Sequence, residues 1–206
     1  MKVRTEARRN AILETAAELF KEMGYERASM NELAKRCGGS KATLYGYFPS
    51  KEELFVAVVE AFATVHLLDA VKELSVEAKG PPTLEVQLTR FGERMLDVLT
   101  NDESALAVYR MVVAEAGRSD VGKLFHESGP AEATEALAKF MKAAMDRGEL
   151  RRSDPMVAAR QFLSLVTAEC DMRQFERNPP PLSPKQIRPM VSRAVETFLR
   201  GVGRTK

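Results

Sequence analysis

Apolar residues recur every three to four positions along almost the whole of this 206-residue chain, and this period limits the fold more than any other feature. The segment 6–23 shows the pattern first. Its stripe holds Ile12, Leu13, Ala16 and Phe20. Because no alternating pattern suited to a strand is longer than chance would give, the sequence predicts an all-α protein of about nine helices.

Glycine, proline and capping residues divide this period into separate helices. A fourth helix begins after Ser50 and is expected to run to about residue 78, where Lys79-Gly80-Pro81-Pro82 cannot continue it. The last two helices are expected at about 154–177 and 184–200. They either pair with a second subunit across a two-fold axis or close the core of one subunit.

Charge is distributed unevenly between the two ends of the chain. The formal net charge is only +2, which excludes a uniformly basic surface. Residues 1–51 hold ten Lys or Arg and six Asp or Glu, whereas the remainder holds 21 and 23. A weakly basic head on a slightly acidic body suggests a polyanionic partner at the N-terminal end. We place the boundary between residues 1–52 and residues 53–206.

Several classes of protein are disfavoured by what the sequence lacks. Cys37 and Cys170 are too few for a disulfide framework, and with His66 and His126 they form no metal-binding pattern. No metalloprotease, phosphate-loop or nucleophile-elbow motif is present, so we expect neither an enzyme nor a cofactor. No apolar run approaches a membrane span and no signal peptide is visible, so we expect a cytoplasmic protein without membrane contact.

The most informative segment is RRNAILETAAELFKEMGYERASMNELAKRCGGSKATLYGYFPSKEELF, residues 8–55. It encodes one supporting helix and two short helices with a glycine turn between them, which is the geometry of a helix-turn-helix. Leu33, Ala34, Leu44 and Phe48 are spaced to meet the stripe of the supporting helix. Gly38 permits the reversal of the backbone. The second short helix, 40–47, can then enter a DNA major groove about 12 Å wide.

The opposite side of helix 40–47 is left to solvent or DNA. Its lysine offers charge, its threonine a hydroxyl and a methyl group, and its tyrosines flat rings with a phenolic donor. Ser29 and Lys51 lie at helix N-termini, where free backbone N–H groups favour a phosphate. The candidate DNA-binding residues are Ser29, Ser40, Lys41, Thr43, Tyr45, Tyr47 and Lys51.

The stretch GGSKATLYGYFPSKEEL, residues 38–54, resembles the N-terminal domain of the TetR family of bacterial transcriptional regulators, whose pattern is GVSxGTLYxYFxSKExL. Turn, recognition helix and next cap agree in register. The resemblance implies that Lys41, Thr43 and Tyr45 lie in or beside the major groove. It also implies that Ser29, Tyr47 and Lys51 contact the DNA backbone.

The resemblance extends less specifically into the body of the chain. Residues 109–130 and 145–166 resemble a C-terminal domain common among TetR-like repressors of efflux and stress genes. The family implies a homodimer with a divergent C-terminal domain, 53–206 here, that binds a ligand and dimerises through its last two helices. A homodimer is also favoured because one recognition helix alone contacts too few bases for a selective operator.

Methionine and aromatic side chains in the body suit a pocket for a small hydrophobic or amphipathic effector, although they fill an ordinary core equally well. The candidates for ligand binding are Phe62, His66, Phe91, Met95, Tyr109, Met111, Phe125, Met141 and Phe162.

These features predict a ligand-responsive transcriptional regulator that acts as a repressor. It would bind a near-palindromic operator in double-stranded DNA as a homodimer through helix 40–47, and a small amphipathic ligand would release it. The alternative is a helical protein-interaction module without sequence-specific DNA binding. Salt dependence separates the two hypotheses, because binding driven by phosphates weakens steeply with salt.

Overall fold

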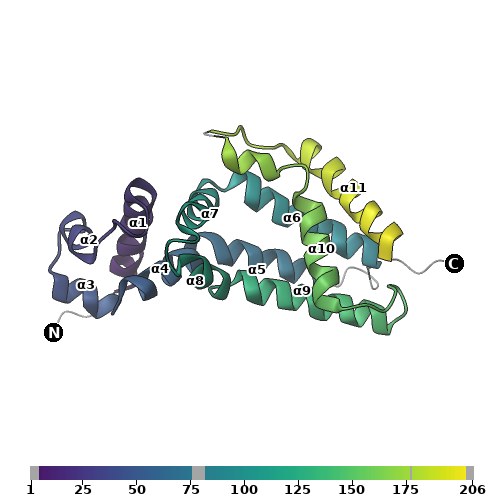
Figure 1. Ribbon diagram of the computed structural model, residues 1–206, viewed down its shortest axis with the longest axis horizontal. Coiled ribbons are helices and arrows are strands. Elements are labelled where there is room, and N and C mark those ends of the chain that lie inside the picture. The colour runs from purple at the N-terminus through teal and green to yellow at the C-terminus, as the bar shows by residue number, and fades with distance from the viewer. Residues whose placement is uncertain (1–4, 76–81, 177, 203–206) are drawn as a thin grey trace. The chain divides into compact units, whose positions relative to one another are not determined.

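The computed structural model describes residues 5–75, 82–176 and 178–202, except for the side chains of residues 63–68 and 75 (Figure 1). Every regular element in these stretches is helical, and eleven of them are α-helices, which confirms the all-α prediction. None of the described helices is long and apolar enough to cross a lipid bilayer. The chain forms two compact units. One contains the residues up to Val65 together with Ser104–Gly129, and the other contains His66–Glu103 and the residues from Pro130 onward.

The first unit joins the N-terminal helices to two helices from much later in the sequence. Its core contains the apolar residues predicted for the helix-turn-helix, including Leu33, Leu44 and Phe48, which confirms that miniature core. Val108 and Val121 complete the same core from the two later helices. The elements of this unit are α1 (Glu6–Met23), α2 (Met30–Arg36), α3 (Lys41–Tyr47), α4 (Lys51–Val59), η1 (Glu60–Thr64), α7 (Glu103–Glu115) and α8 (Val121–Glu127). The functional boundary between residues 52 and 53 stays a prediction.

The fourth expected helix, 50–78, is interrupted rather than continuous. After α4 the backbone forms the π-helical segment η1, and α5 (Val65–Lys72) and the 3₁₀ turn η2 (Glu73–Ser75) follow. Its expected end near residue 78 lies outside the described residues. A π-helical segment is rare and shifts the hydrogen-bond register. The shift occurs where the chain passes from the first unit to the second.

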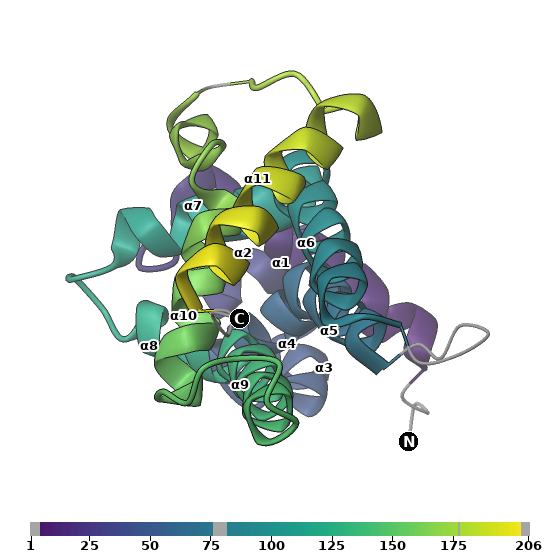
Figure 2. The same cartoon turned by 90° about the vertical axis from the view of Figure 1, so that its right-hand side faces the viewer.

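The second unit is a packed group of long helices. In it, α10 (Pro155–Thr167) packs on α9 (Pro130–Asp146) and on α11 (Pro184–Val202), and α11 packs on α6 (Leu84–Asn101), an arrangement visible in Figure 2. Phe162 links these layers, because its ring lies 6.1 Å from that of Phe91 and 5.1 Å from that of Phe198. The segment η3 (Asp171–Phe175) also belongs to this unit.

Close approach between α6 and α11 depends on one glycine. A Cβ atom at Gly92 would lie 2.7 Å from Cγ1 of Val191, a distance that real Cβ contacts do not show. Because position 92 has no side chain, the backbone of α6 at Gly92 can lie against the side chain of Val191 on α11. Both residues are buried.

The helix expected at 154–177 is shorter than predicted. It begins as expected with Asp154 as N-cap, but α10 ends at Thr167 and the chain turns into the 3₁₀ segment η3. Contacts after the turn explain the early end. The Arg173 guanidinium donates to the carbonyl of Pro180. The side chain of Asn101 donates to the carbonyl of Leu182 (2.9 Å) and accepts from its amide (2.7 Å).

Candidate nucleic-acid interface

Two serine caps define the helix-turn-helix in the first unit. The Ser29 hydroxyl accepts a hydrogen bond from the amide of Glu32 (3.2 Å) and begins α2. The Ser40 hydroxyl accepts from the amide of Thr43 (3.1 Å) and begins α3. Between them Gly38 has φ +61°, a left-handed conformation that glycine adopts without strain. The caps and the turn predicted from the sequence are therefore confirmed.

One side of α3 is anchored and the other is open. Leu44 is 3% exposed and packs in the core of the first unit, whereas Tyr45 is 45% exposed. Lys41 and Thr43 are also exposed. The three side chains predicted to meet the groove are thus all exposed, on a helix that its buried leucine holds in place. Their contact with DNA stays a prediction.

The serine and threonine hydroxyls at the start of α3 already have partners. Oγ of Ser40 lies 2.9 Å from Oγ1 of Thr43, in addition to the capping bond. Ser29 is likewise a cap. These hydroxyls stabilise helix ends, and the exposed amides at those ends remain the groups best suited to a phosphate.

The Tyr47 hydroxyl ties the start of the described chain to α3. It accepts a hydrogen bond from the amide of Thr5 (2.9 Å) and is half-buried. A phenol that accepts one bond still has its own proton to donate. The hydroxyl can therefore serve the fold and a DNA phosphate together.

Lys51 has a structural role that the sequence did not predict. Its Nζ donates to the carbonyl oxygens of Tyr25 (2.8 Å), Glu26 (3.2 Å) and Ala28 (3.2 Å), and it lies 4.2 Å from the centre of the Tyr25 ring. An ammonium group has three donors, and all three are used here. In this conformation Lys51 closes the α1–α2 connection, and the predicted phosphate contact would require it to exchange a carbonyl partner.

Around Lys51, a tyrosine and a carboxylate complete a small polar cluster. The Tyr25 hydroxyl donates to Oε1 of Glu52 (3.3 Å). The pKa of Tyr25 is raised above its usual value, first by burial and then by the negative charge of Glu52. The pKa of Glu52 is lowered, chiefly because its carboxylate accepts a hydrogen bond from its own backbone amide at the start of α4. Both shifts stabilise the protonation states present at neutral pH.

Arg8 was also missed by the sequence analysis. Its Nη2 donates to the carbonyl of Cys37 in the turn (2.7 Å) and would lie 3.0 Å from a Cβ atom at Gly39. The guanidinium therefore fills the corner that the missing side chain of Gly39 leaves. No local sequence signal joins residues 29 positions apart, because only the folded turn brings them together.

The candidate effector residues separate into two groups. Phe91, Met95, Met141 and Phe162 are buried in one core of the second unit. In the first unit Met111 is buried and Phe62 packs against the core, while the rings of Tyr109 and Phe125 lie 6.3 Å apart. The side chain of His66 lies outside the described residues. Tyr109 is exposed, whereas the other described candidates lie in or against one of the two cores. Their role in ligand binding stays a prediction.

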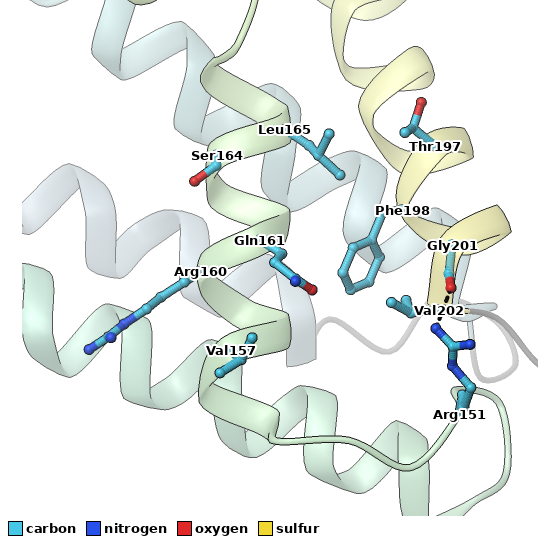
Figure 3. Close-up of a pocket in the computed structure, with 10 residues that line it drawn as sticks. All are labelled: Arg151, Val157, Arg160, Gln161, Ser164, Leu165, Thr197, Phe198, Gly201 and Val202. Carbon is cyan, nitrogen blue, oxygen red and sulfur yellow. Dashed lines mark hydrogen bonds between the residues drawn. The ribbon is translucent and has the colours of Figure 1, made fainter.

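Among the described residues, no group of three His, Cys, Asp or Glu side chains is arranged to hold a metal ion. A groove of about 660 Å³ does lie in the second unit, between the N-terminal half of α10 and the end of α11 (Figure 3). Gln161 and Phe198 face it from opposite helices, and Arg151 closes one end by donating to the carbonyl of Gly201 (2.6 Å). Helical periodicity does not predict this groove, because the groove depends on how the two helices pack.

Two family models match successive parts of the chain. The family described as "Bacterial regulatory proteins, tetR family" matches residues 12–58. The family described as "AefR-like transcriptional repressor, C-terminal domain" matches residues 86–202, more than half of the chain. The chain belongs to the TetR family. The predicted resemblance is thereby confirmed, and this TetR-family protein is a transcriptional regulator, a class that is not enzymatic.

Similar proteins support the assignment over the full chain. A TetR-family regulator from Mesorhizobium loti has a structure with a TM-score of 0.78 and 26% identity, covering 98% of this chain and 100% of that one. The flavonoid-responsive regulator FrrA has a TM-score of 0.75 and 30% identity with the same coverage. The A-factor receptor protein of Streptomyces griseus is 26% identical over 159 residues, which are 76% of this chain and 51% of that protein. The chain spans about half the length of that curated relative.

Proposed function

We infer that this TetR-family protein is a ligand-responsive repressor, and that it binds a near-palindromic operator as a homodimer through the exposed side of α3. The observation that carries the proposal is the arrangement of α3, in which the buried Leu44 fixes the helix while Lys41, Thr43 and Tyr45 project outward. A short helix held in this way can enter a major groove with its side chains against the base edges.

The chemistry of the exposed side chains suits DNA. Lys41 supplies charge for a phosphate or a guanine edge, and Thr43 presents a methyl group that can contact thymine. Tyr45 adds a flat ring and a phenolic donor. Tyr47, the last residue of α3, would contact the sugar-phosphate backbone, as would the N-terminal amides of α2 and α4, the helices before and after α3 in the chain. Three side chains would therefore recognise the bases, and the flanking backbone contacts would fix the position of the protein along the DNA.

A homodimer would supply the second recognition helix. Two copies related by a two-fold axis would place their α3 helices in successive major grooves about 34–36 Å apart. The last two helices, α10 and α11, are the candidates for the contact between copies, because they form one exposed side of the second unit (Figure 2). Binding to an operator would also place the protein's action in the cytoplasm.

Release by a small amphipathic ligand would act through a shift between two populated conformations. Support comes from FrrA, which is named as a flavonoid-responsive regulator, and from the methionine and phenylalanine side chains of the second core, including Met141 and Phe162. Such side chains repack readily around a guest. A flavonoid is therefore the first probe to add to the complex with DNA. Binding of the flavonoid to the protein is first measured by itself. If the flavonoid then saturates the protein and the affinity for the operator does not change, release by this class of ligand is contradicted.

The test of DNA binding begins with selection of bound sequences from random duplexes. The selected duplex is then titrated by fluorescence anisotropy at several salt concentrations. We expect a two-fold symmetric site, and a logarithmic salt slope of about −0.9 for each phosphate neutralised. Lys41→Ala should weaken binding and reduce that slope, whereas the matched change Lys139→Ala, on an exposed residue of α9, should alter neither.

The alternative, a helical protein-interaction module, predicts a different outcome of the same titration. Such a protein would select no sequence and would show equal, weak binding to every duplex. Tyr45→Ala separates the hypotheses further, because loss of a base contact costs roughly 1–3 kcal/mol of discrimination. An unchanged sequence preference and affinity in both Lys41→Ala and Tyr45→Ala would refute the proposed face.

A further inference from the structure

The start of α1 contacts both ends of α3. The backbone amide of Thr5, the N-cap of α1, donates to the hydroxyl of Tyr47 at the end of α3 (2.9 Å). Arg8, three residues further along α1, reaches the turn that precedes α3, where its Nη2 donates to the carbonyl oxygen of Cys37 (2.7 Å). A guanidinium group is therefore fixed beside the first turn of the helix that is proposed to enter the DNA groove.

The positive charge of Arg8 is not neutralised by the protein, in contrast to that of another arginine of the helix-turn-helix. Arg36 forms ion pairs with Glu22 (2.7 Å) and Glu32 (3.3 Å). Lys51 keeps its charge, but carbonyl oxygens take all three of its donors. Arg8 contacts a neutral carbonyl, and in the stretches that the structure describes no carboxylate lies within ion-pair distance of it. Its charge therefore remains for an anionic partner.

The guanidinium of Arg8 also has donors to spare. A guanidinium carries five N–H donors on a rigid planar fork. One donor binds the carbonyl of Cys37, and the other donors meet no acceptor within the described part of the chain. The side chain is half-buried, so solvent still reaches it. Because such forks bind phosphate oxygens through two parallel hydrogen bonds, Arg8 can hold the turn and a phosphate together.

Gly39 leaves the space that the guanidinium occupies. A Cβ atom at position 39 would lie 3.0 Å from Nη2 of Arg8, which is closer than a Cβ atom ordinarily approaches another heavy atom. The TetR-family pattern has valine at this position, and the two methyl groups of valine would displace the guanidinium. Glycine in place of valine therefore admits a cation to the turn before α3.

This corner lies at the end of α3 that carries its exposed lysine. Gly39 is followed directly by the N-cap Ser40 and by Lys41, which is exposed. A major groove is about 12 Å wide and is bounded by two phosphate strands. A cation beside the first turn of a helix in that groove is therefore close to one of the strands.

We propose that Arg8 binds a phosphate of the operator backbone at the start of α3 while its Nη2 keeps the carbonyl of Cys37. This inference rests on the proposed DNA binding through α3. It adds a contact from α1, and it assigns to Arg8 the phosphate-binding role that Lys51, with its donors occupied, fills less readily.

Salt-dependent titration tests the phosphate contact. Arg8→Ala should weaken binding to the selected duplex by on the order of ten-fold and reduce the logarithmic salt slope by about 0.9, the value for one phosphate. Unrelated duplexes should lose affinity by the same factor, because a phosphate carries no sequence information. The control Arg118→Ala removes the same charge from an exposed position between α7 and α8 and should change neither quantity. An unchanged slope in Arg8→Ala overturns the inference.

Gly39→Val tests whether the corner fixes the guanidinium. The variant should remain folded by circular dichroism, yet bind DNA with the reduced affinity and slope of Arg8→Ala. Arg8→Ala added to Gly39→Val should weaken binding by less than about two-fold further, because both changes remove the same contact. Parent affinity in Gly39→Val, or losses that multiply in the double variant, would overturn the fixed position of Arg8.

Arg8→Lys separates the charge from the architecture of the turn. Lysine restores the positive charge, so the salt slope should return to the parent value, although the affinity should stay lower because an ammonium lacks the planar fork. If Arg8 served the turn alone, Arg8→Ala would lose affinity with no change in slope. That result would overturn the phosphate contact.

Failure of this inference differs from failure of the proposed function. A parent protein that selects no duplex and shows no salt dependence overturns both. A parent protein that binds its operator with a steep slope, together with an Arg8→Ala variant of equal slope, overturns the contact of Arg8 and leaves the proposed function intact.

Discussion

The α2–α3 pair and the α10–α11 pair each consist of two helices that follow one another in the chain, but different interactions define them. In the first pair, each helix begins at a serine whose hydroxyl accepts a hydrogen bond from the backbone amide three residues later. The connection between the two helices contains a glycine with positive φ. In the second pair α10 ends without such a signal, and η3 follows because Arg173 and Asn101 hold the chain after it. Local chemistry specifies the first pair, and distant contacts specify the second.

This difference suggests that the two pairs of helices contribute differently to folding stability and to binding. The α2–α3 pair needs only a small core beneath it, so one side of α3 remains free for a partner. The α10–α11 pair is part of a large core in which the rings of Phe91, Phe162 and Phe198 are in contact. Substitutions in the two pairs should therefore differ in size and in the property that they change.

The largest expected effect is on the second core. Phe162→Ala should lower the free energy of unfolding by about 3–5 kcal/mol, because it removes a fully buried ring between three helices. Urea denaturation followed by circular dichroism measures it. Phe162→Leu, which leaves a smaller cavity, should recover much of the loss. A loss below about 1 kcal/mol for alanine would mean that long-range packing does not define this region.

A smaller effect is expected for Lys51→Ala, which tests whether the first unit is specified only locally. Loss of a charged donor to three carbonyl groups should lower the free energy of unfolding by roughly 1.5–3 kcal/mol. Lys35→Ala, on an exposed position of α2, should change it by about 0.5 kcal/mol or less. If the two variants are equally stable, the carbonyl contacts of Lys51 contribute nothing to folding.

Capping residues allow a direct comparison of the two pairs. Ser40→Ala and Asp154→Ala each remove an N-cap and should each cost about 1 kcal/mol of folding stability. Only Ser40→Ala should also weaken operator binding in the anisotropy assay, since it loosens α3. Equal losses of DNA affinity in the two variants would break the proposed separation between the pairs.

The smallest effect is confined to alkaline pH. The pKa of Tyr25 is raised by burial and by Glu52, so the folded protein holds this proton when the unfolded chain has lost it. The contribution is complete below about pH 10, the ordinary value for tyrosine, and is lost as the pH rises further. Tyr25→Phe should therefore show a shallower fall in the free energy of unfolding between pH 9 and 11 than the parent protein. Identical slopes would contradict a raised pKa.

Much of the first unit was predictable from local patterns. The stripe of α1, the caps at Ser29 and Ser40 and the turn at Gly38 all depend on residues within a few positions of each other. The exposed side of α3 followed from the burial of Leu44. These features did not require knowledge of the remaining chain.

Contacts between distant segments were not predictable in the same way. Lys51 reaches carbonyl groups 23–26 residues away, and Arg8 reaches the turn at Cys37. Helices α7 and α8 complete the core of the first unit, although about 43 and 61 residues respectively separate them from the end of α4 in the sequence. Helical periodicity shows that a face is apolar, but it does not say which other face will cover it.

Residue order alone therefore established an all-helical chain, a capped helix-turn-helix and the polar side of its second helix, since hydrogen bonds and periodicity within one or two turns encode them. Folding in three dimensions decided how Lys51 and Arg8 are used, where α10 ends, and that a groove opens beside Phe198. These outcomes depend on which apolar surfaces exclude water together, and that choice is made between segments far apart in the chain.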